Sequence, residues 1–101
     1  MHALEFLNTL ERIIDDRIEA GDAASYTAKL AAGAPAAPAK KLGEEGVEVA
    51  LAGVAEDAGR LTEESADLLY HLLVLLRVRS VRLRDVVAEL ERRHRGSRPV
   101  R

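Results

Sequence analysis

The chain has 101 residues and a formal net charge of −2, and 48% of its residues are apolar but only 3% are aromatic. This length fits one domain and leaves no room for a separate cofactor-binding domain. The chain contains no cysteine, which excludes disulfides and cysteine-ligated metal sites and favours a cytoplasmic location. Residues 1–16 mix acidic with apolar side chains, and no apolar run approaches the roughly 18 residues of a membrane span, so we expect no secretion and no membrane insertion.

Charge is distributed unequally along the chain. Residues 1–76 hold 6 Lys and Arg against 14 Asp and Glu, whereas residues 77–101 hold 9 Arg against 3 acidic residues. An arginine-rich end can bind nucleic acid, but acidic residues interleave with these arginines and no aromatic residue lies among them. We therefore expect no nucleic-acid partner, and we expect residues 96–101 to form a disordered basic tail.

The first predicted element is a helix. Apolar residues recur at three- and four-residue steps from Leu4 to Ile18, which predicts a helix of about 17 residues that Gly21 ends. The following segment, residues 20–39, is rich in Gly, Ala, Ser and Pro. It predicts a long loop with at most one short helical turn, around residues 28–32, and a loop of that length is often part of a binding site.

Three further helices are expected after the loop. The second begins near Pro38, a residue suited to the first helical position, and ends at about residue 58. The third begins at Thr62 as its N-cap and ends at about residue 79, and the fourth covers residues 83–94. The chain shows no strand pattern, internal repeat or glycine-rich phosphate loop. The predicted fold class is therefore all-α, an antiparallel bundle of about four helices.

We expect residues 1–95 to form a single domain that is completed by homodimerisation. The apolar residues are mostly small, so the core of a lone monomer is expected to be thin. In addition, the third predicted helix is apolar on every side, as is typical of a helix surrounded by protein. A second copy of the chain would cover it.

Acidic residues share the apolar faces of the second and third predicted helices. The apolar arc of the second helix, which we expect to face the core, consists of Val47, Leu51, Val54, Ala55 and Ala58. Its opposite, solvated side consists of Gly53, Glu56, Asp57 and Arg60. On a wheel of 100° per residue, Glu44 lies within the apolar arc, and Glu45 and Glu48 lie beside it. On the third helix, Glu64 and Asp67 likewise share a face with apolar residues.

This arrangement predicts a metal site. Glu45 and Glu48 form one i,i+3 pair and Glu64 and Asp67 form another, so two helices can each present two carboxylates to one point. Desolvated carboxylates side by side cost several kcal/mol each unless they are protonated or paired, and we expect no Lys or Arg on these faces. Four hard oxygen donors favour Mg²⁺, for which Mn²⁺ can substitute, and magnesium bound in this way commonly takes substrate phosphates as further ligands.

A simpler interpretation stays open for each acidic residue taken alone. The glutamates then only fringe a core, with Lys40 and Lys41 as i,i+4 partners for Glu44 and Glu45. His71 is expected to be a hydrogen-bonded core histidine rather than a metal ligand, because the Glu-x-x-His pairs of di-iron bundles are not met.

The sequence around these carboxylates resembles the phosphoribosyl-ATP pyrophosphohydrolase family, the second enzyme of histidine biosynthesis. Residues 40–49 read KKLGEEGVEV and residues 64–71 read ESADLLYH. Their E-E-x-x-E…E-x-x-D pattern is shared by the wider MazG-like all-α pyrophosphohydrolases. The SYT segment at residues 25–27 and the ELERR segment at residues 89–93 narrow the resemblance to this enzyme, and it covers most of residues 4–94.

The resemblance implies a MazG-like, Mg²⁺-dependent homodimer that converts phosphoribosyl-ATP and water to phosphoribosyl-AMP and pyrophosphate. The metal ligands are then Glu45, Glu48, Glu64 and Asp67. The catalytic carboxylates are Glu44, Glu45 and Glu48, with Glu44 either supporting the metal ligands from outside the metal's own ligand set or orienting the attacking water. The candidate substrate and phosphate contacts are Arg17, Ser25, Tyr26, Thr27, Lys40, Lys41, Tyr70 and His71.

Two other functions fit parts of the same pattern. One is a house-cleaning nucleoside triphosphate pyrophosphohydrolase of the MazG-like superfamily, with the same metal site and a different base pocket. The other is a catalytically silent helical dimerisation module, in which the apolar third helix is interface and the acidic residues are fringe. Turnover of substrates distinguishes the first, and magnesium binding distinguishes the second.

Overall fold

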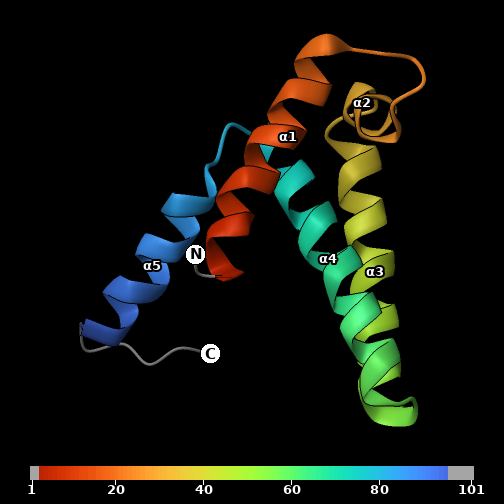
Figure 1. The fold of residues 1–101 in the computed structure, drawn as a ribbon, viewed down its shortest axis with the longest axis vertical. Helices are drawn as coiled ribbons and strands as arrows, with labels where there is room; N and C mark the ends of the chain where they lie inside the picture. Colours follow the sequence, from red (N-terminus) through yellow and green to blue (C-terminus); the bar gives the residue numbers. More distant parts are fainter. Residues whose placement is uncertain (1–2, 96–101) are drawn as a thin grey trace.

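The computed structural model describes residues 3–95, and within that range all regular secondary structure is helical (Figure 1). The all-α prediction is confirmed. The elements are the 3-10 turn η1 (Ala3–Glu5) and the helices α1 (Phe6–Ala20), α2 (Tyr26–Ala32), α3 (Ala36–Ala55), α4 (Ala58–Val78) and α5 (Leu83–Arg95). None of these helices is both long and apolar enough to cross a membrane. The basic tail expected at residues 96–101 lies outside the described residues.

The first helix ends where the sequence predicts. Gly21 adopts a left-handed conformation, with φ of 62°, and its N–H donates to the carbonyl of Arg17. Glycine adopts this conformation without the steric cost that a Cβ would add. The end of α1 is therefore set by a single residue.

The loop expected after α1 contains a helix, α2, which is longer than the single turn that we predict. Ser25 precedes it in an extended conformation and caps it, since its Oγ accepts a hydrogen bond from the N–H of Ala28 at 3.2 Å. A serine N-cap followed by helix-forming residues is sufficient to start a helix. Residues 3–95 thus hold five α-helices rather than four.

The boundary between α3 and α4 also differs from the prediction. Asp57, not Thr62, is the N-cap of α4, and its Oδ1 accepts a hydrogen bond from the N–H of Arg60 at 2.9 Å. Thr62 lies inside the helix and donates to the carbonyl of Ala58 at 2.8 Å. The second predicted helix therefore ends earlier than expected, and residues near 60 belong to the start of α4.

Helices α3 and α4 form an antiparallel hairpin (Figure 1). Helix α1 crosses α4 near the end of α4 that is opposite the α3–α4 connection. The buried core lies at this crossing, where Ile14 of α1 packs with Leu73 and Val74 of α4. Partly buried apolar residues surround this cluster, and Ala52 is buried separately on α3. The core within one chain is small, as the composition predicts.

The apolar arc of α3 does not face the core of the chain, and that prediction is wrong. Val47, Leu51 and Val54 are 60%, 59% and 88% exposed. The face that α3 packs inward instead carries Pro38, Glu45 and Ala52. A helical wheel locates an apolar stripe, but it does not indicate whether the stripe contacts the same chain or another surface.

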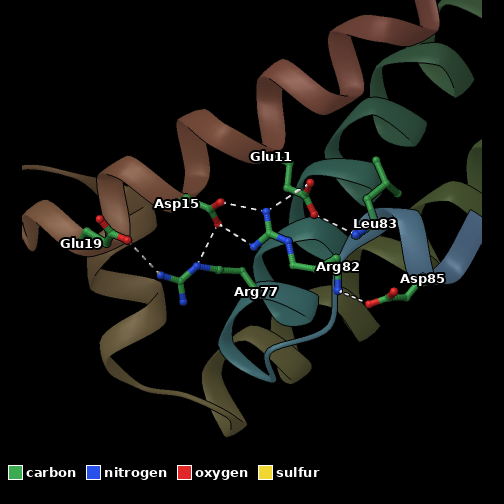
Figure 2. A network of polar contacts seen from close by, with 7 residues as sticks. All are labelled: Glu11, Asp15, Glu19, Arg77, Arg82, Leu83 and Asp85. Atoms are coloured by element: carbon green, nitrogen blue, oxygen red, sulfur yellow. Dashed lines mark hydrogen bonds and ion pairs between the residues drawn. The ribbon is translucent and has the colours of Figure 1, made fainter.

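The last helix, α5, extends away from the α3–α4 hairpin (Figure 1). No side chain within Leu83–Arg95 is buried. The connection from α4 includes Ser80, which has a φ of 60° although it is not glycine. Polar contacts to α1 fix this connection in place (Figure 2).

These contacts centre on Asp15 and Glu11 of α1. Asp15 accepts from Arg77 Nε at 2.8 Å and from Arg82 Nη2 at 2.9 Å. Glu11 lies 3.3 Å from Arg82 Nη2 and accepts from the N–H of Leu83, the first residue of α5, at 2.8 Å (Figure 2). The hydrogen bonds and charges of Arg82 and Arg77 lower the pKa of Asp15 against the opposing effect of burial.

We expect Asp15→Asn to lower the free energy of unfolding at pH 7 by about 1–2 kcal/mol. For a domain of this size that corresponds to a fall in Tm of roughly 5–15 °C. The two partly buried guanidinium groups of Arg77 and Arg82 lose the carboxylate that they share and keep only their longer contacts to Glu19 and Glu11. Because the pKa of Asp15 is lowered in the folded chain, its contribution is present above its ordinary pKa and is lost as the pH falls through the lowered value.

Thermal unfolding followed by circular dichroism between pH 7 and pH 2 tests this. The difference in Tm between wild type and Asp15→Asn should shrink at the acid end. The neighbouring, exposed Asp16 provides the control, since Asp16→Asn should leave Tm within about 2 °C of wild type, as is usual for surface substitutions. Equal effects of the two substitutions would contradict the role assigned to Asp15.

Candidate active site

The hairpin of α3 and α4 brings three of the four predicted metal ligands together. One carboxylate oxygen from each of Glu45, Glu48 and Glu64 lies within 4.8 Å of the other two. Oxygen ligands lie about 2.1 Å from Mg²⁺, so two oxygens on one octahedral ion are about 3.0 Å apart when adjacent and about 4.2 Å apart when opposite. The three carboxylates are therefore close enough to one another to be brought onto one ion.

Two members of this carboxylate group are buried. Glu45 is 4% exposed and Glu64 is 8% exposed. Among the residues that the structure describes, Glu45 Oε2 and Glu64 Oε1 have no hydrogen-bond partner. Buried polar atoms are almost always satisfied in folded proteins, and a buried carboxylate oxygen without a partner is costly. These two oxygens therefore fit a site for a cation.

The acidic residues also act on one another. The pKa of Glu48 is raised, first by the charge of Glu45 and then by the adjacent carboxylate of Glu64. A raised carboxylate pKa next to like charges means that the fully ionised group is unfavourable by itself. A positive charge placed among the three would relieve this repulsion.

Two basic side chains partly neutralise the group. The contact of Lys41 with Glu45 is the i,i+4 pair of the simpler interpretation, whereas the contact of Arg60 with Glu64 is contrary to our expectation that no Lys or Arg would lie on these faces. Lys41 Nζ lies 3.4 Å from Glu45 Oε1, and this contact raises the pKa of Lys41. Arg60 Nη2 donates to Glu64 Oε2 at 2.5 Å. The sequence places Arg60 on the solvated side of the second helix, but the observed boundary puts it one turn before Glu64 on α4.

The remaining predicted carboxylates, Glu44 and Asp67, are both exposed. Among residues 3–95, the group of mutually close carboxylate oxygens consists of Glu45, Glu48 and Glu64, without Asp67. The contact that the structure gives Asp67 near the site is made by its backbone, whose carbonyl accepts a hydrogen bond from His71 Nδ1 at 2.7 Å.

A hydrogen-bonded chain joins α2 to α4 beside the carboxylates. His71 is 7% exposed, and the hydroxyl of Tyr26 lies 2.8 Å from its Nε2. A carbonyl only accepts, so His71 Nδ1 donates its proton to the backbone carbonyl of Asp67. Nε2 and the hydroxyl of Tyr26 form a second hydrogen bond. Both ring nitrogens thus have protein partners, as expected of a core histidine. Burial raises the pKa of Tyr26.

The other predicted substrate contacts lie on or around α2, and most of them bond to neighbouring protein groups. Thr27 is buried, and its hydroxyl contacts the hydroxyl of Tyr70. Arg17 Nη1 lies 3.5 Å from the same Tyr70 hydroxyl. Arg17 and Ser25, the cap of α2, also border a surface pocket of about 330 Å³. Lys40 is exposed one turn before Glu44 on α3.

Known proteins of one kind resemble this chain over almost its whole length. The family described as phosphoribosyl-ATP pyrophosphohydrolase matches residues 7–94. A protein from Rhizobium etli (strain CIAT 652) named phosphoribosyl-ATP pyrophosphatase is 52% identical over 87 residues, which cover 86% of this chain and 81% of that protein. An equally named protein from Methylobacterium nodulans is 54% identical over 87 residues, with the same two coverages.

A third relative extends this similarity. The phosphoribosyl-ATP pyrophosphatase of Pyrobaculum neutrophilum is 53% identical over 91 residues, which cover 90% of this chain and 97% of that protein. All of the carboxylates discussed above lie within residues 7–94.

Proposed function

The chain belongs to the phosphoribosyl-ATP pyrophosphohydrolase family, and from this we propose that it hydrolyses phosphoribosyl-ATP to phosphoribosyl-AMP and pyrophosphate, the second step of histidine biosynthesis. Water is added across the bond between the α- and β-phosphates, so one product keeps the α-phosphate and the other is pyrophosphate. The observation that carries the proposal beyond family membership is the group of three carboxylates, two buried oxygens of which have no hydrogen-bond partner within residues 3–95. We expect the reaction in the cytoplasm.

We propose that Glu45, Glu48 and Glu64 hold Mg²⁺, with Mn²⁺ as a substitute, and that Asp67 completes the set from the exposed edge of α4. Hard carboxylate oxygens suit these ions. When bound, the ion neutralises negative charge on the phosphate oxygens of the substrate. In this proposal Glu44, exposed on α3 next to Glu45, orients the attacking water or a ligand of the ion, and a carboxylate next to the ion accepts the proton of the water.

We propose two kinds of substrate contact. Lys40 and Lys41 present ammonium groups one turn before the carboxylates, where they can meet the polyphosphate. Arg17 and Ser25 lie across the α1–α2 connection and are available to the ribose phosphate. The exposure of Lys40 supports the first contact. The position of Arg17 and Ser25 on the surface pocket supports the second.

The aromatic and hydroxyl residues that join α2 to α4 have a different proposed role. Tyr26, Thr27, Tyr70 and His71 bond to one another or to the backbone. Their proposed contribution to substrate binding is to hold α2 against α4 and to present the exposed part of the Tyr26 ring, which is 51% exposed as a residue.

We also propose that the enzyme acts as a homodimer. Val47, Leu51 and Val54 of α3 and Leu69 of α4 are 45% to 88% exposed within one chain. Val47, Leu51 and Val54 share one face of α3 by their three- and four-residue spacing. Large apolar residues gathered on one exposed helix face are typical of an interface. A second copy of the same hairpin offers a matching apolar face, as a twofold interface requires.

Turnover assays test the proposed function. Purified protein is incubated with phosphoribosyl-ATP and with a panel of nucleoside triphosphates, with and without Mg²⁺, and the release of pyrophosphate is followed. We expect Mg²⁺-dependent release from phosphoribosyl-ATP that exceeds release from the other nucleotides. Efficient turnover of nucleoside triphosphates alone would favour the house-cleaning enzyme, and no turnover of any substrate would favour the silent dimerisation module.

A further inference from the structure

The side chain of Arg60 contacts Glu64 of the carboxylate group, and this contact is not needed to start helix α4. Its three guanidinium nitrogens bond to three different carboxylates: Nε to Glu56 at 3.3 Å, Nη1 to Glu63 at 2.6 Å and Nη2 to Glu64 at 2.5 Å. The start of α4 is already capped by Asp57, through the backbone of Arg60 rather than its side chain. The side chain is thus available for a role at Glu64.

The three partners of Arg60 differ in exposure. The side chains of Glu56 and Glu63 are 42% and 66% exposed, whereas the side chain of Glu64 is 10% exposed. Glu56 and Glu63 therefore hold the guanidinium group at the rim of the site from the solvent side. Only Nη2 reaches the buried carboxylate. If that one contact is lost, two charged partners still keep Arg60 in place.

Glu64 is the point at which two positive charges would meet. Its Oε2 accepts from Arg60 and its Oε1 is buried without a partner among the described residues. A divalent cation held by Glu45, Glu48 and Glu64 would draw on the same carboxylate and would repel the guanidinium group a few ångströms away. Lys41 does not meet this conflict to the same degree, since its contact to Glu45 is longer, at 3.4 Å.

We propose that Arg60 and the divalent cation compete for Glu64, and that Arg60, still held by Glu56 and Glu63, then donates from Nη2 to the phosphate oxygens of the pyrophosphate group. This proposal rests on the metal site and the reaction proposed above. Guanidinium groups are suited to the second role because their planar donors match phosphate oxygens. Arg60 would thus be a substrate-binding residue for the part of the substrate that leaves as pyrophosphate.

Metal binding provides the first test, and it does not depend on activity. Mn²⁺ is titrated calorimetrically into wild type, Arg60→Gln and the control Arg92→Gln. Arg92 on α5 forms an ion pair of the same length, 2.5 Å to Glu89, so the control removes an equal charge outside the carboxylate group. We expect Arg60→Gln to bind Mn²⁺ about threefold to tenfold more tightly than wild type, and Arg92→Gln to stay within about twofold, as is usual for a surface ion pair.

Pyrophosphate binding provides the second test, with the opposite sign. Inhibition by inorganic pyrophosphate at saturating Mg²⁺ should weaken by about tenfold or more in Arg60→Gln, because a charge-assisted hydrogen bond is lost. Arg60→Lys restores the charge without the planar fork, so it should return Mn²⁺ affinity towards wild type while recovering pyrophosphate binding only in part. A side chain that only supported the helix would not change the two affinities in opposite directions.

The outcomes separate this proposal from the one on which it rests. If wild type binds Mn²⁺ and Arg60→Gln binds it equally or more weakly, competition for Glu64 is refuted while the metal site stands. If Mn²⁺ binding tightens but pyrophosphate inhibition is unchanged, the phosphate contact is refuted. If wild type binds no Mn²⁺, the proposed metal site itself fails, and the role of Arg60 fails with it.

Discussion

Replacement of any one of Glu45, Glu48, Glu64 or Asp67 by its amide is expected to lower the rate of phosphoribosyl-ATP hydrolysis by about a hundredfold or more. Each amide keeps the shape of the side chain but loses the charge that a divalent cation needs. The far-UV helical signal should stay unchanged, since these positions lie within helices that the substitutions do not interrupt. Steady-state kinetics and circular dichroism measure the two properties on the same samples.

Melting curves with and without EDTA show whether lost activity reflects lost metal binding. EDTA should lower the Tm of wild type, because a ligand that binds only the folded state stabilises it. It should have much less effect on Glu48→Gln, whose Tm in EDTA should equal or exceed that of wild type because the repulsion from Glu45 is removed. The control is Glu91→Gln on the exposed side of α5. A wild type whose melting and activity are insensitive to EDTA would contradict the metal site.

The second large effect is expected at the exposed apolar face of α3. Wild type should sediment as a dimer at micromolar concentration, and Leu51→Glu should sediment as a monomer. Leu51 is 59% exposed in the single chain, so glutamate is tolerated there by one chain alone. In a dimer the same carboxylate would be buried without a partner, at a cost of several kcal/mol.

The control for this prediction places the same charge on another exposed apolar residue. Leu4 in η1 is 79% exposed, and it borders a surface pocket with residues of α1 and α5 rather than of the α3–α4 hairpin. Leu4→Glu should leave the dimer intact. A monomeric wild type would remove the prediction altogether, and dissociation by Leu4→Glu but not by Leu51→Glu would move the interface to the other end of the molecule.

The parts of the fold that local sequence determines were predictable. The left-handed glycine at Gly21 and the three- and four-residue spacing before it mark α1 without any knowledge of its neighbours. The same is true of the carboxylate group, since the i,i+3 spacing of Glu45 and Glu48 places them on adjacent parts of one helix surface. Only a helical hairpin was then needed to bring Glu64 to them.

The parts that depend on contacts between helices were not predictable in the same way. Asp57 and Thr62 are both acceptable N-caps, and the choice between them decides whether Arg60 faces solvent or Glu64. The exposed stripe at Val47 and Leu51 has the apolar character of a core face, so its partner cannot be identified from one chain. The link from Tyr26 to His71 joins residues far apart in sequence, which no local pattern indicates.

The position of α5 has a consequence for how the chain opens. An isolated helix of 13 residues is marginal in water, since most helical stability in proteins comes from packing. With no buried side chain, α5 depends on its own ion pairs and on the contacts of Arg82 and Leu83 to α1. Its amides should therefore exchange with solvent through local fraying at a low free energy, well below that of global unfolding. We therefore expect α5 to unfold locally while α1 to α4 stay folded. Salt, which weakens the ion pairs of α5, should lower the stability of this helix more than that of the other four.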